Sequence, residues 1–190
     1  FGVMASVLAK TMLGRENPVV ALLSNGEEKG KGNQLAKETF DLLRASSLNF
    51  VGNIEGRDLF AGNVDVVVCD GFVGNVVIKE AEGLASSMGR VLKGELRRGF
   101  FGQIGTMLAL NALKRFARLM DYTEYGGAPL MGLRGSCLIC HGASNAKAMA
   151  SAVRMAARFV AMEANSHLSE AVAANIDLTG PRRQAANEQR

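Results

Sequence analysis

Tryptophan is absent from the 190-residue sequence, and only two tyrosines, three prolines and two histidines occur. Aromatic residues make up 6% of the chain, too few for the stacking surfaces that bind single-stranded nucleic acid. We therefore expect no nucleic-acid partner. The three cysteines are too few for a disulfide framework and favour a reducing compartment, so we expect a cytoplasmic protein.

Long apolar runs are also missing. The longest stretch without a charged residue covers residues 99–113 and contains Gln103 and Asn111. A helix that spans a bilayer needs about 20 apolar residues, so we do not expect this stretch to cross a membrane. No basic start followed by an apolar core and a cleavage site is visible, which agrees with a cytoplasmic location.

The overall composition is that of a folded protein. Hydrophobic residues make up 48% of the chain and charged residues 21%, with a mean hydropathy of +0.09. This composition excludes intrinsic disorder of the whole chain. The 22 basic residues exceed the 18 acidic ones and give a net charge of +4, which suits an acidic partner without requiring nucleic acid.

Short apolar runs alternate with helical patterns along the chain. Runs rich in valine, isoleucine and leucine predict strands that are buried on both faces of a sheet; they cover residues 19–23, 50–51, 64–69 and 137–140. Periodic or alanine-rich patterns predict helices at residues 34–44, 76–92 and 145–164. This alternation predicts an α/β fold with a mostly parallel sheet. A helical insert at about residues 91–121 interrupts it, and residues 178–190 read as a polar tail after one folded unit of residues 1–177.

Each predicted strand ends in a polar, glycine-rich corner. The corners are Ser24-Asn25-Gly26, residues 52–56, Asp70-Gly71 and His141-Gly142. In open parallel sheets, ligands bind outside the carboxyl ends of the strands. We therefore expect these corners to converge on one crevice.

Asparagine marks the start of three predicted helices, at Asn33, Asn75 and Asn145. Asparagine is a preferred N-cap, and each of these residues by itself fits an ordinary structural cap. Helix N-termini also attract anions, and Lys31 and Lys147 lie close by in the sequence. Together these features favour an anion site. We expect no nucleotide cofactor, because neither the phosphate-loop motif nor the dinucleotide-binding motif is present.

His141 directly follows a predicted buried strand, where a general acid or base, or a donor to an oxyanion, is expected. A structural histidine is the alternative, and His167 fits a surface residue. Cys137, Cys140 and His141 match the attachment pattern of c-type haem, and the two cysteines resemble a redox pair. Haem attachment needs an exported, exposed segment, so we interpret the cysteines as small buried hydrophobic residues. Because His141 adds only one ligand to the two cysteines and no further cysteine pair exists, we expect no metal site.

Basic residues flank an apolar segment within the insert. The basic side chains are Lys93, Arg97, Arg98, Lys114, Arg115 and Arg118, and the apolar segment contains Phe100, Phe101, Ile104, Met107, Leu108, Leu110 and Leu113. This pattern is typical of helices that lie on an anionic membrane surface. A hairpin that packs a dimer is the alternative, and the two can both hold.

Five segments together resemble one family, the bacterial phosphate acyltransferases of phospholipid synthesis (the PlsX type). They are LLSNGEEKGKGN at residues 22–33, VGNIEGRD at 51–58, VVCDGFVGN at 67–75, YGGAPL at 125–130 and HGASNA at 141–146. The matches occur in the same order over residues 1–157. Family members are longer at the N-terminus, so the chain is similar to the C-terminal part of such an enzyme.

The resemblance implies that acyl-acyl carrier protein and inorganic phosphate are converted to acyl phosphate and free carrier protein, without a cofactor. It also implies a three-layer α/β/α fold like that of the isocitrate and isopropylmalate dehydrogenases, a homodimer and peripheral association with the membrane. The residues that fit the catalytic role are Lys31, Asn75 and His141. Those that fit phosphate or substrate binding are Asn25, Gly26, Gly32, Asn33, Asp70, Gly71, Gly74, Gly142, Ser144 and Asn145. Those that fit contact with the carrier protein or the membrane are Arg97, Arg98, Phe100, Phe101, Lys114 and Arg115.

Two other functions remain open from the sequence. One is a related enzyme on the same kind of scaffold, either an acyltransferase that uses coenzyme A thioesters or a relative of the 2-hydroxy acid dehydrogenases. The other is a non-catalytic module that binds the membrane or a carrier protein.

Overall fold

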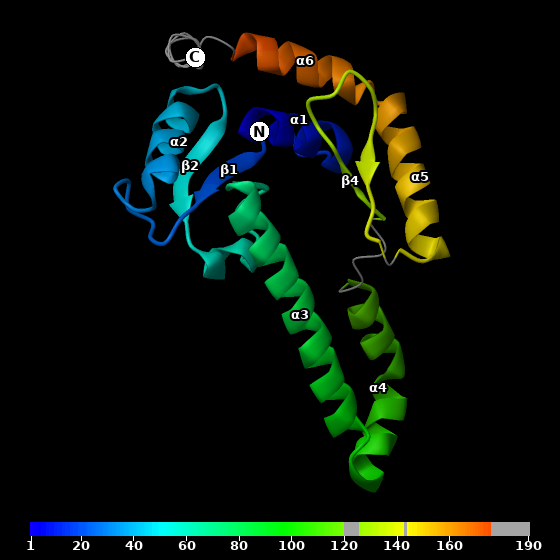
Figure 1. The fold of residues 1–190 in the computed structure, drawn as a ribbon. Coiled ribbons are helices and arrows are strands. Elements are labelled where there is room, and N and C mark those ends of the chain that lie inside the picture. The colour runs from blue at the N-terminus through cyan, green and yellow to red at the C-terminus, as the bar shows by residue number, and fades with distance from the viewer. Residues whose placement is uncertain (120–125, 143, 176–190) are drawn as a thin grey trace.

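The computed structural model describes residues 1–119, 126–142 and 144–175 and has an α/β architecture (Figure 1). Its central element is a three-stranded parallel sheet with the strand order β2-β1-β3. A separate antiparallel pair, β4 and β5, lies outside this sheet. The elements in chain order are α1 Gly2–Leu13, β1 Val19–Leu23, α2 Gln34–Ala45, β2 Asn49–Ile54, the 3₁₀ helix η1 Gly56–Phe60, β3 Val66–Val68, α3 Gly71–Leu96, α4 Gly99–Leu119, β4 Ala128–Pro129, β5 Leu138–Ile139, α5 Ala146–Ala161 and α6 Ala164–Ala174.

Strand β1 is the most deeply buried part of the sheet. Val20 and Ala21 are fully buried, and Leu22 is 3% exposed. Ala9 of α1 packs with Val20 and Val66, whereas Phe40 and Leu43 of α2 pack with Leu22. A strand paired on both edges and covered by helices has no polar environment, which explains its uninterrupted apolar sequence. The prediction of a parallel sheet with buried strands at residues 19–23 and within 64–69 is confirmed.

Strand β2 contains a bulge and extends on both sides of the predicted residues 50–51. Val20 pairs with Phe50 and Ala21 pairs with Gly52, so Val51 has no partner in the register. Gly52 has a φ of +112°, which favours glycine. This irregularity breaks the apolar alternation of the strand, and the sequence pattern therefore marked only residues 50–51.

The strand predicted at residues 137–140 is wrong as part of the parallel sheet. Only Leu138–Ile139 is extended, and it pairs antiparallel with Ala128–Pro129. Ile139 is 55% exposed, and Cys137 and Cys140 are half-buried. Periodicity cannot place a short apolar run in a particular sheet. The segment before β4 packs closely on α5. Gly126 has a φ of +74°, and a Cβ at this position would collide with the backbone of Ala152.

The insert forms a helical hairpin that projects from the rest of the molecule (Figure 1). Helix α3 continues through the boundary that was expected near residue 91. It contains Gly83, Gly89 and Gly94, each of which lowers helix propensity without ending the helix. The hairpin turns at Gly99, which has a φ of +73°. There, the Thr106 hydroxyl donates to the carbonyl of Leu96 at 2.9 Å. Among the described residues, no helix is long and apolar enough to cross a membrane.

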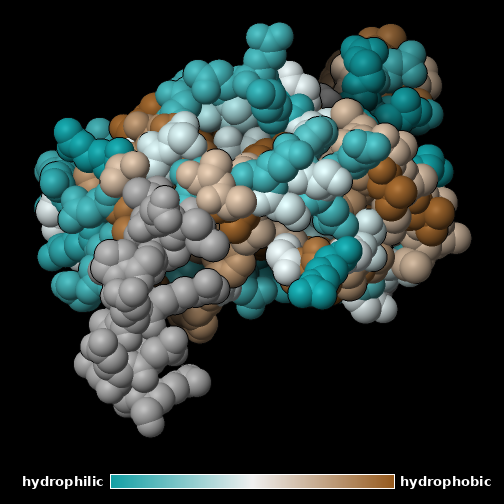
Figure 2. Space-filling view, turned by 90° about the horizontal axis from the view of Figure 1, so that it is seen from above, coloured by the Kyte–Doolittle hydropathy of each residue, from teal (hydrophilic) through white to brown (hydrophobic). Residues whose placement is uncertain are grey.

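Helices α1, α5 and α6 share a second core. Met12, Phe159, Ala164 and Leu168 are buried together. The helix predicted at residues 145–164 corresponds to α5, which ends at Ala161, and Glu163, at a φ of +49°, separates it from α6. Seen from above, this side of the molecule is mostly hydrophilic and is interrupted by apolar patches (Figure 2). Val153 and Val160 of α5 are exposed apolar residues.

Replacing Phe159 with alanine tests this second core. The side chain is 2% exposed, so its truncation leaves a cavity between the three helices. We expect a loss of about 3–5 kcal/mol in the free energy of unfolding, measured by urea denaturation. Phe60→Ala is the matched control: this side chain is 78% exposed, and its loss should cost within about 0.5 kcal/mol. Equal destabilisation by both changes would contradict the assignment of this core.

Candidate functional site

A cleft of about 1250 Å³ opens at the carboxyl ends of β1 and β3, beside the first turns of α1 and α2. Its walls are mainly apolar, from residues such as Leu22, Leu35 and Val68. Residues from three of the four predicted corners line it as well: Ser24 and Asn25, Gly56, and Asp70 and Gly71. Their neighbours Gly32, Asn33 and Cys69 also line the cleft. The cleft therefore joins an apolar volume to a polar rim made by the ends of adjacent strands.

The loop between β1 and α2 curls over the N-terminus of α2. The side-chain oxygen of Asn25 accepts from the amide of Gly32 at 2.8 Å, and that of Asn33 accepts from the amide of Ala36 at 2.9 Å. Asn33 is thus the N-cap, as predicted. Gly32 has a φ of +95°, and a Cβ at this position would be 2.7 Å from the Cβ of Ala36. Only glycine fits this close approach.

Lys31 and Lys29 are both exposed cations of this loop. In the described part of the chain Lys31 pairs with no carboxylate, whereas Lys29 pairs with Asp41 at 3.2 Å. Gly26 makes room for the Lys31 stem, because a Cβ at Gly26 would be 2.7 Å from Cγ of Lys31. A cation and a helix N-terminus with a neutral cap therefore lie in one short segment, which is a favourable arrangement for an anion.

The N-terminus of α3 is different because Asp70 caps it. Its carboxylate accepts from the amides of Phe72 and Val73, both at 2.9 Å. A carboxylate that occupies these donors competes with any other anion, so α2 is the better anion site. Asn75, predicted at the start of the helix, lies in its second turn, since the helix already begins at Gly71. Gly74 allows close packing, because a Cβ there would be 3.1 Å from the Cys69 sulfur.

Two buried polar atoms at the same edge of the sheet were not among the predicted site residues. The hydroxyl oxygen of Ser24 and the side-chain oxygen of Asn53 are buried without a hydrogen-bond partner. The amide of Asn53 donates to the carbonyl of Glu28 at 2.9 Å and so ties the β1–α2 loop to β2. Both residues belong to the polar corners that the sequence marks, which is the signal that points to them.

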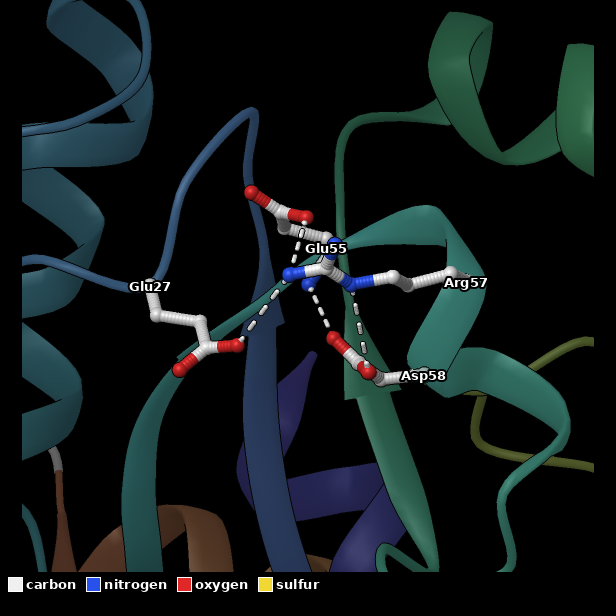
Figure 3. Close-up of polar contacts among 4 residues, drawn as sticks. All are labelled: Glu27, Glu55, Arg57 and Asp58. Carbon is white, nitrogen blue, oxygen red and sulfur yellow. Dashed lines mark hydrogen bonds and ion pairs between the residues drawn. The ribbon is translucent and has the colours of Figure 1, made fainter.

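Arg57 provides a second tie between this loop and β2 (Figure 3). Its guanidinium lies 2.9 Å from the Glu55 carboxylate, 3.6 Å from that of Glu27 and 3.9 Å from that of Asp58. Asp58 also accepts from the backbone amide of Glu55 at 2.9 Å and closes the capping box of η1. Because Arg57 is neutralised by these carboxylates, we assign it to holding the loop and not to binding an anion.

His141 does not line the cleft. It is exposed after β5, and its Nε2 lies 3.5 Å from Nζ of Lys79 on α3. Sequence analysis did not mark Lys79, because nothing local distinguishes it from other helical lysines. Gly142 is exposed in the same corner, the amide of Ser144 donates to the carbonyl of His141 at 2.9 Å, and Asn145 caps α5 as predicted.

The residues assigned to carrier or membrane contact lie on the hairpin. Phe100 and Phe101 are 72% and 86% exposed beside the turn, with Arg97 and Arg98 next to them. Lys114 and Arg115 are exposed farther along α4. The structure thus separates these residues from the polar rim of the cleft.

The chemistry of the cleft gives no sign of an activated thiol. Burial, and then the neighbouring charge of Asp70, raise the pKa of the Cys69 thiol above its ordinary value. All three cysteines are free. Among the described residues, no group of three or more histidine, cysteine or acidic side chains could hold a metal ion.

Removing the Asp70 charge should make Cys69 more reactive. Because the carboxylate disfavours the thiolate, Asp70→Asn should lower the pKa of Cys69 and speed its alkylation about two- to five-fold at mildly alkaline pH. Asparagine keeps the helix cap. The measurement is the rate of iodoacetamide labelling of the Cys69 peptide by mass spectrometry, with Cys140 as the internal control. An unchanged Cys69 rate would contradict the electrostatic cause.

Comparison with known proteins identifies the family. The family model described as "Fatty acid synthesis protein" matches residues 1–167. A phosphate acyltransferase of Nitratidesulfovibrio vulgaris (strain DP4) is 59% identical over 180 residues, which is 94% of this chain and 52% of the relative. One of Syntrophotalea carbinolica is 53% identical over 168 residues, 88% of this chain and 48% of the relative.

The chain spans about half the length of the curated relatives that it matches. The matched region includes the β1–α2 loop, the start of α3 and the His141 corner, so the features described above lie within the shared part. The chain belongs to the fatty acid synthesis protein family, whose curated relatives are named phosphate acyltransferase.

Proposed function

We propose that this chain supplies the phosphate-binding half of an enzyme that transfers a long acyl chain from acyl carrier protein to inorganic phosphate. The observation that carries the proposal is the β1–α2 loop: it holds Lys31 and the Asn33-capped N-terminus of α2, and its residues Asn25, Gly32 and Asn33 line an apolar cleft. This combination suits a small dianion next to an apolar substrate. The names of the relatives agree with it.

In this reaction, a phosphate oxygen attacks the thioester carbonyl carbon. The carbonyl becomes a tetrahedral oxyanion, the carbon–sulfur bond breaks, and the carrier thiolate leaves and takes up a proton. Phosphate itself is the nucleophile, so no enzyme nucleophile is needed, in keeping with the raised pKa of Cys69. Positioning and charge stabilisation then provide most of the rate.

Each proposed site residue has a distinct role. Lys31 and the amide of Asn33 bind phosphate, Gly32 lets the anion approach the backbone closely, and Asn25, which accepts from the Gly32 amide, shapes the loop. Asn75 and His141 are proposed to contact the reacting thioester. Asp70 holds the N-terminus of α3, where it repels a second anion and so directs phosphate towards α2.

The α3–α4 hairpin suits two further roles, peripheral attachment to an anionic membrane and packing of a homodimer. Its exposed phenylalanines and arginines provide the apolar and basic groups that anionic lipid surfaces attract. Attachment there would release acyl phosphate near the lipid enzymes of phosphatidic acid synthesis. The basic side chains also suit an acidic carrier protein.

A non-catalytic binding module is the second candidate, favoured by the exposed apolar and basic side chains of the hairpin. A coenzyme A thioester in place of acyl carrier protein is a variant of the first proposal. Phosphate-dependent release of the free thiol carrier, measured side by side with a long-chain acyl carrier protein and with the matching coenzyme A thioester, distinguishes all three. The assay should compare this chain with a fusion to the preceding part of the Nitratidesulfovibrio vulgaris relative.

Lys31→Ala tests the anion site in whichever of these two proteins turns over. Loss of one charged hydrogen bond to phosphate, about 1.5–3 kcal/mol, should raise the KM for phosphate about 10- to 100-fold. Lys29→Ala is the matched control, because it removes the same charge from the same loop but from a lysine paired with Asp41. An unchanged phosphate dependence in Lys31→Ala would remove this residue from the site. Vesicle binding without turnover by either protein would favour the binding module.

Replacing Phe100 and Phe101 with glutamate tests the hairpin. The double change removes exposed apolar area and adds negative charge, so we expect loss of sedimentation with anionic vesicles and unchanged turnover in solution. Phe60→Glu is the control, since this phenylalanine is also exposed but lies on η1. Dissociation of a dimer, detected by light scattering, would instead assign the hairpin to packing between copies.

A further inference from the structure

The backbone carbonyl of Glu28, in the β1–α2 loop, accepts two hydrogen bonds. One comes from the side-chain amide of Asn53 on β2, at 2.9 Å. The other comes from the backbone amide of Lys31, at 3.0 Å. The second bond closes a β-turn over residues 28–31, in which the carbonyl of the first residue accepts from the amide of the fourth. Asn53 and Lys31 therefore meet at a single oxygen atom, although they belong to different elements.

Asn53 is a polar residue at a buried position of the sheet. It is 8% exposed and pairs in register with the buried Leu22 of β1. Its Nδ2 faces the Glu28 carbonyl, because two oxygen atoms facing each other would repel. Its Oδ1 is buried without a hydrogen-bond partner among the described residues, and such an atom lowers stability. An apolar side chain would suit the core better at this position, so we look for the use of Asn53 in the bond that it makes.

That bond fixes the turn that carries Lys31. The long lysine stem is mobile, so the position of the ammonium depends on where the backbone of the turn is held. Arg57 also ties the loop to this side of the sheet through Glu27, but Arg57 is 72% exposed, and an exposed ion pair contributes little in water. The bond from Asn53 is a buried tie that acts directly on the carbonyl to which the Lys31 amide is bonded.

We propose that Asn53 is a positioning residue for Lys31: its buried side-chain amide holds the Glu28–Lys31 turn at the mouth of the cleft. Asn53 does not touch the anion. It restricts the space that Lys31 samples, and so reduces the loss of freedom when an anion binds. This inference rests on the proposed phosphate site for its functional meaning, whereas the mechanical part, the holding of the turn, is independent of that site.

Hydrogen exchange of the Lys31 amide tests the mechanical part. Asn53→Leu is close to isosteric, and it removes the donor to Glu28 together with the unpartnered Oδ1. We expect exchange at Lys31 to become about 3- to 10-fold faster, because the turn loses one of the two bonds to its carbonyl. The measurement is amide exchange followed by NMR. The Ala36 amide, which donates to the Asn33 side chain, should keep its rate and is the internal reference.

Asn49→Leu is the matched control, because Asn49 lies at the other end of the same strand and its side-chain amide donates to the carbonyl of Asn17 at 3.4 Å. It should leave exchange at Lys31 unchanged. An unchanged rate in Asn53→Leu, or an equal increase at Lys31 and Ala36, would overturn the proposal. Asn53→Ala replaces Asn53→Leu if circular dichroism shows that the leucine variant does not fold.

Inorganic phosphate is the probe for the functional part. In a titration followed through the Asn33 amide signal, Asn53→Leu should raise the dissociation constant of phosphate about 3- to 10-fold. In a Lys31→Ala background the same change should add less than about two-fold, because Asn53 acts through Lys31. An unchanged affinity in Asn53→Leu, or equal weakening in both backgrounds, would reject the positioning role.

The two measurements keep this inference separate from the proposed function. A parent protein that binds no phosphate would refute the proposed anion site. Exchange at Lys31 would still decide whether Asn53 holds the turn, because it needs neither phosphate nor turnover.

Discussion

Burial of the central strand β1 is the constraint on which the other features depend. With Val20 and Ala21 fully buried and both edges paired, the strand can end only in a segment that finds polar partners outside the sheet. That segment is the β1–α2 loop, whose polar groups bond to one another through Asn25 and to β2 through Asn53. The parallel sheet thereby holds the β1–α2 loop, which is rich in glycine and lysine, in one position at the cleft.

The two helix N-termini at this edge are specialised in opposite ways. Helix α2 has a neutral asparagine cap and a nearby lysine, whereas α3 has a carboxylate that already accepts two amides. Electrostatics therefore favour α2 over α3 as the place of the proposed anion site. Arg57 supports the same outcome, since its ion pairs with Glu55, Glu27 and Asp58 remove it as a competing anion site and stiffen the loop (Figure 3).

Local chemistry explains what could be predicted from the sequence. The buried strand at residues 19–23 and the caps Asn33 and Asn145 follow from apolar runs and side-chain hydrogen bonding, which act within a few residues. The strand at residues 137–140 was predicted in the wrong sheet, because its pairing partner β4 cannot be recognised from the local sequence. Asn75 was predicted at the start of its helix, but Asp70 caps the helix and starts it at Gly71. The contact of Lys79 with His141 joins distant segments and has no local signature.

Helix α3 separates the cleft at one of its ends from the exposed turn of the hairpin at the other. Helix α3 has 26 residues, none of them buried, and an α-helix of this size is about 39 Å long. One end carries Asp70 at the cleft and the other carries the turn with Phe100 and Phe101. An exposed apolar patch of this kind is typical of a surface that binds a partner or lipid. Because the two ends are separated by the whole helix, binding at the tip leaves the rim of the cleft accessible.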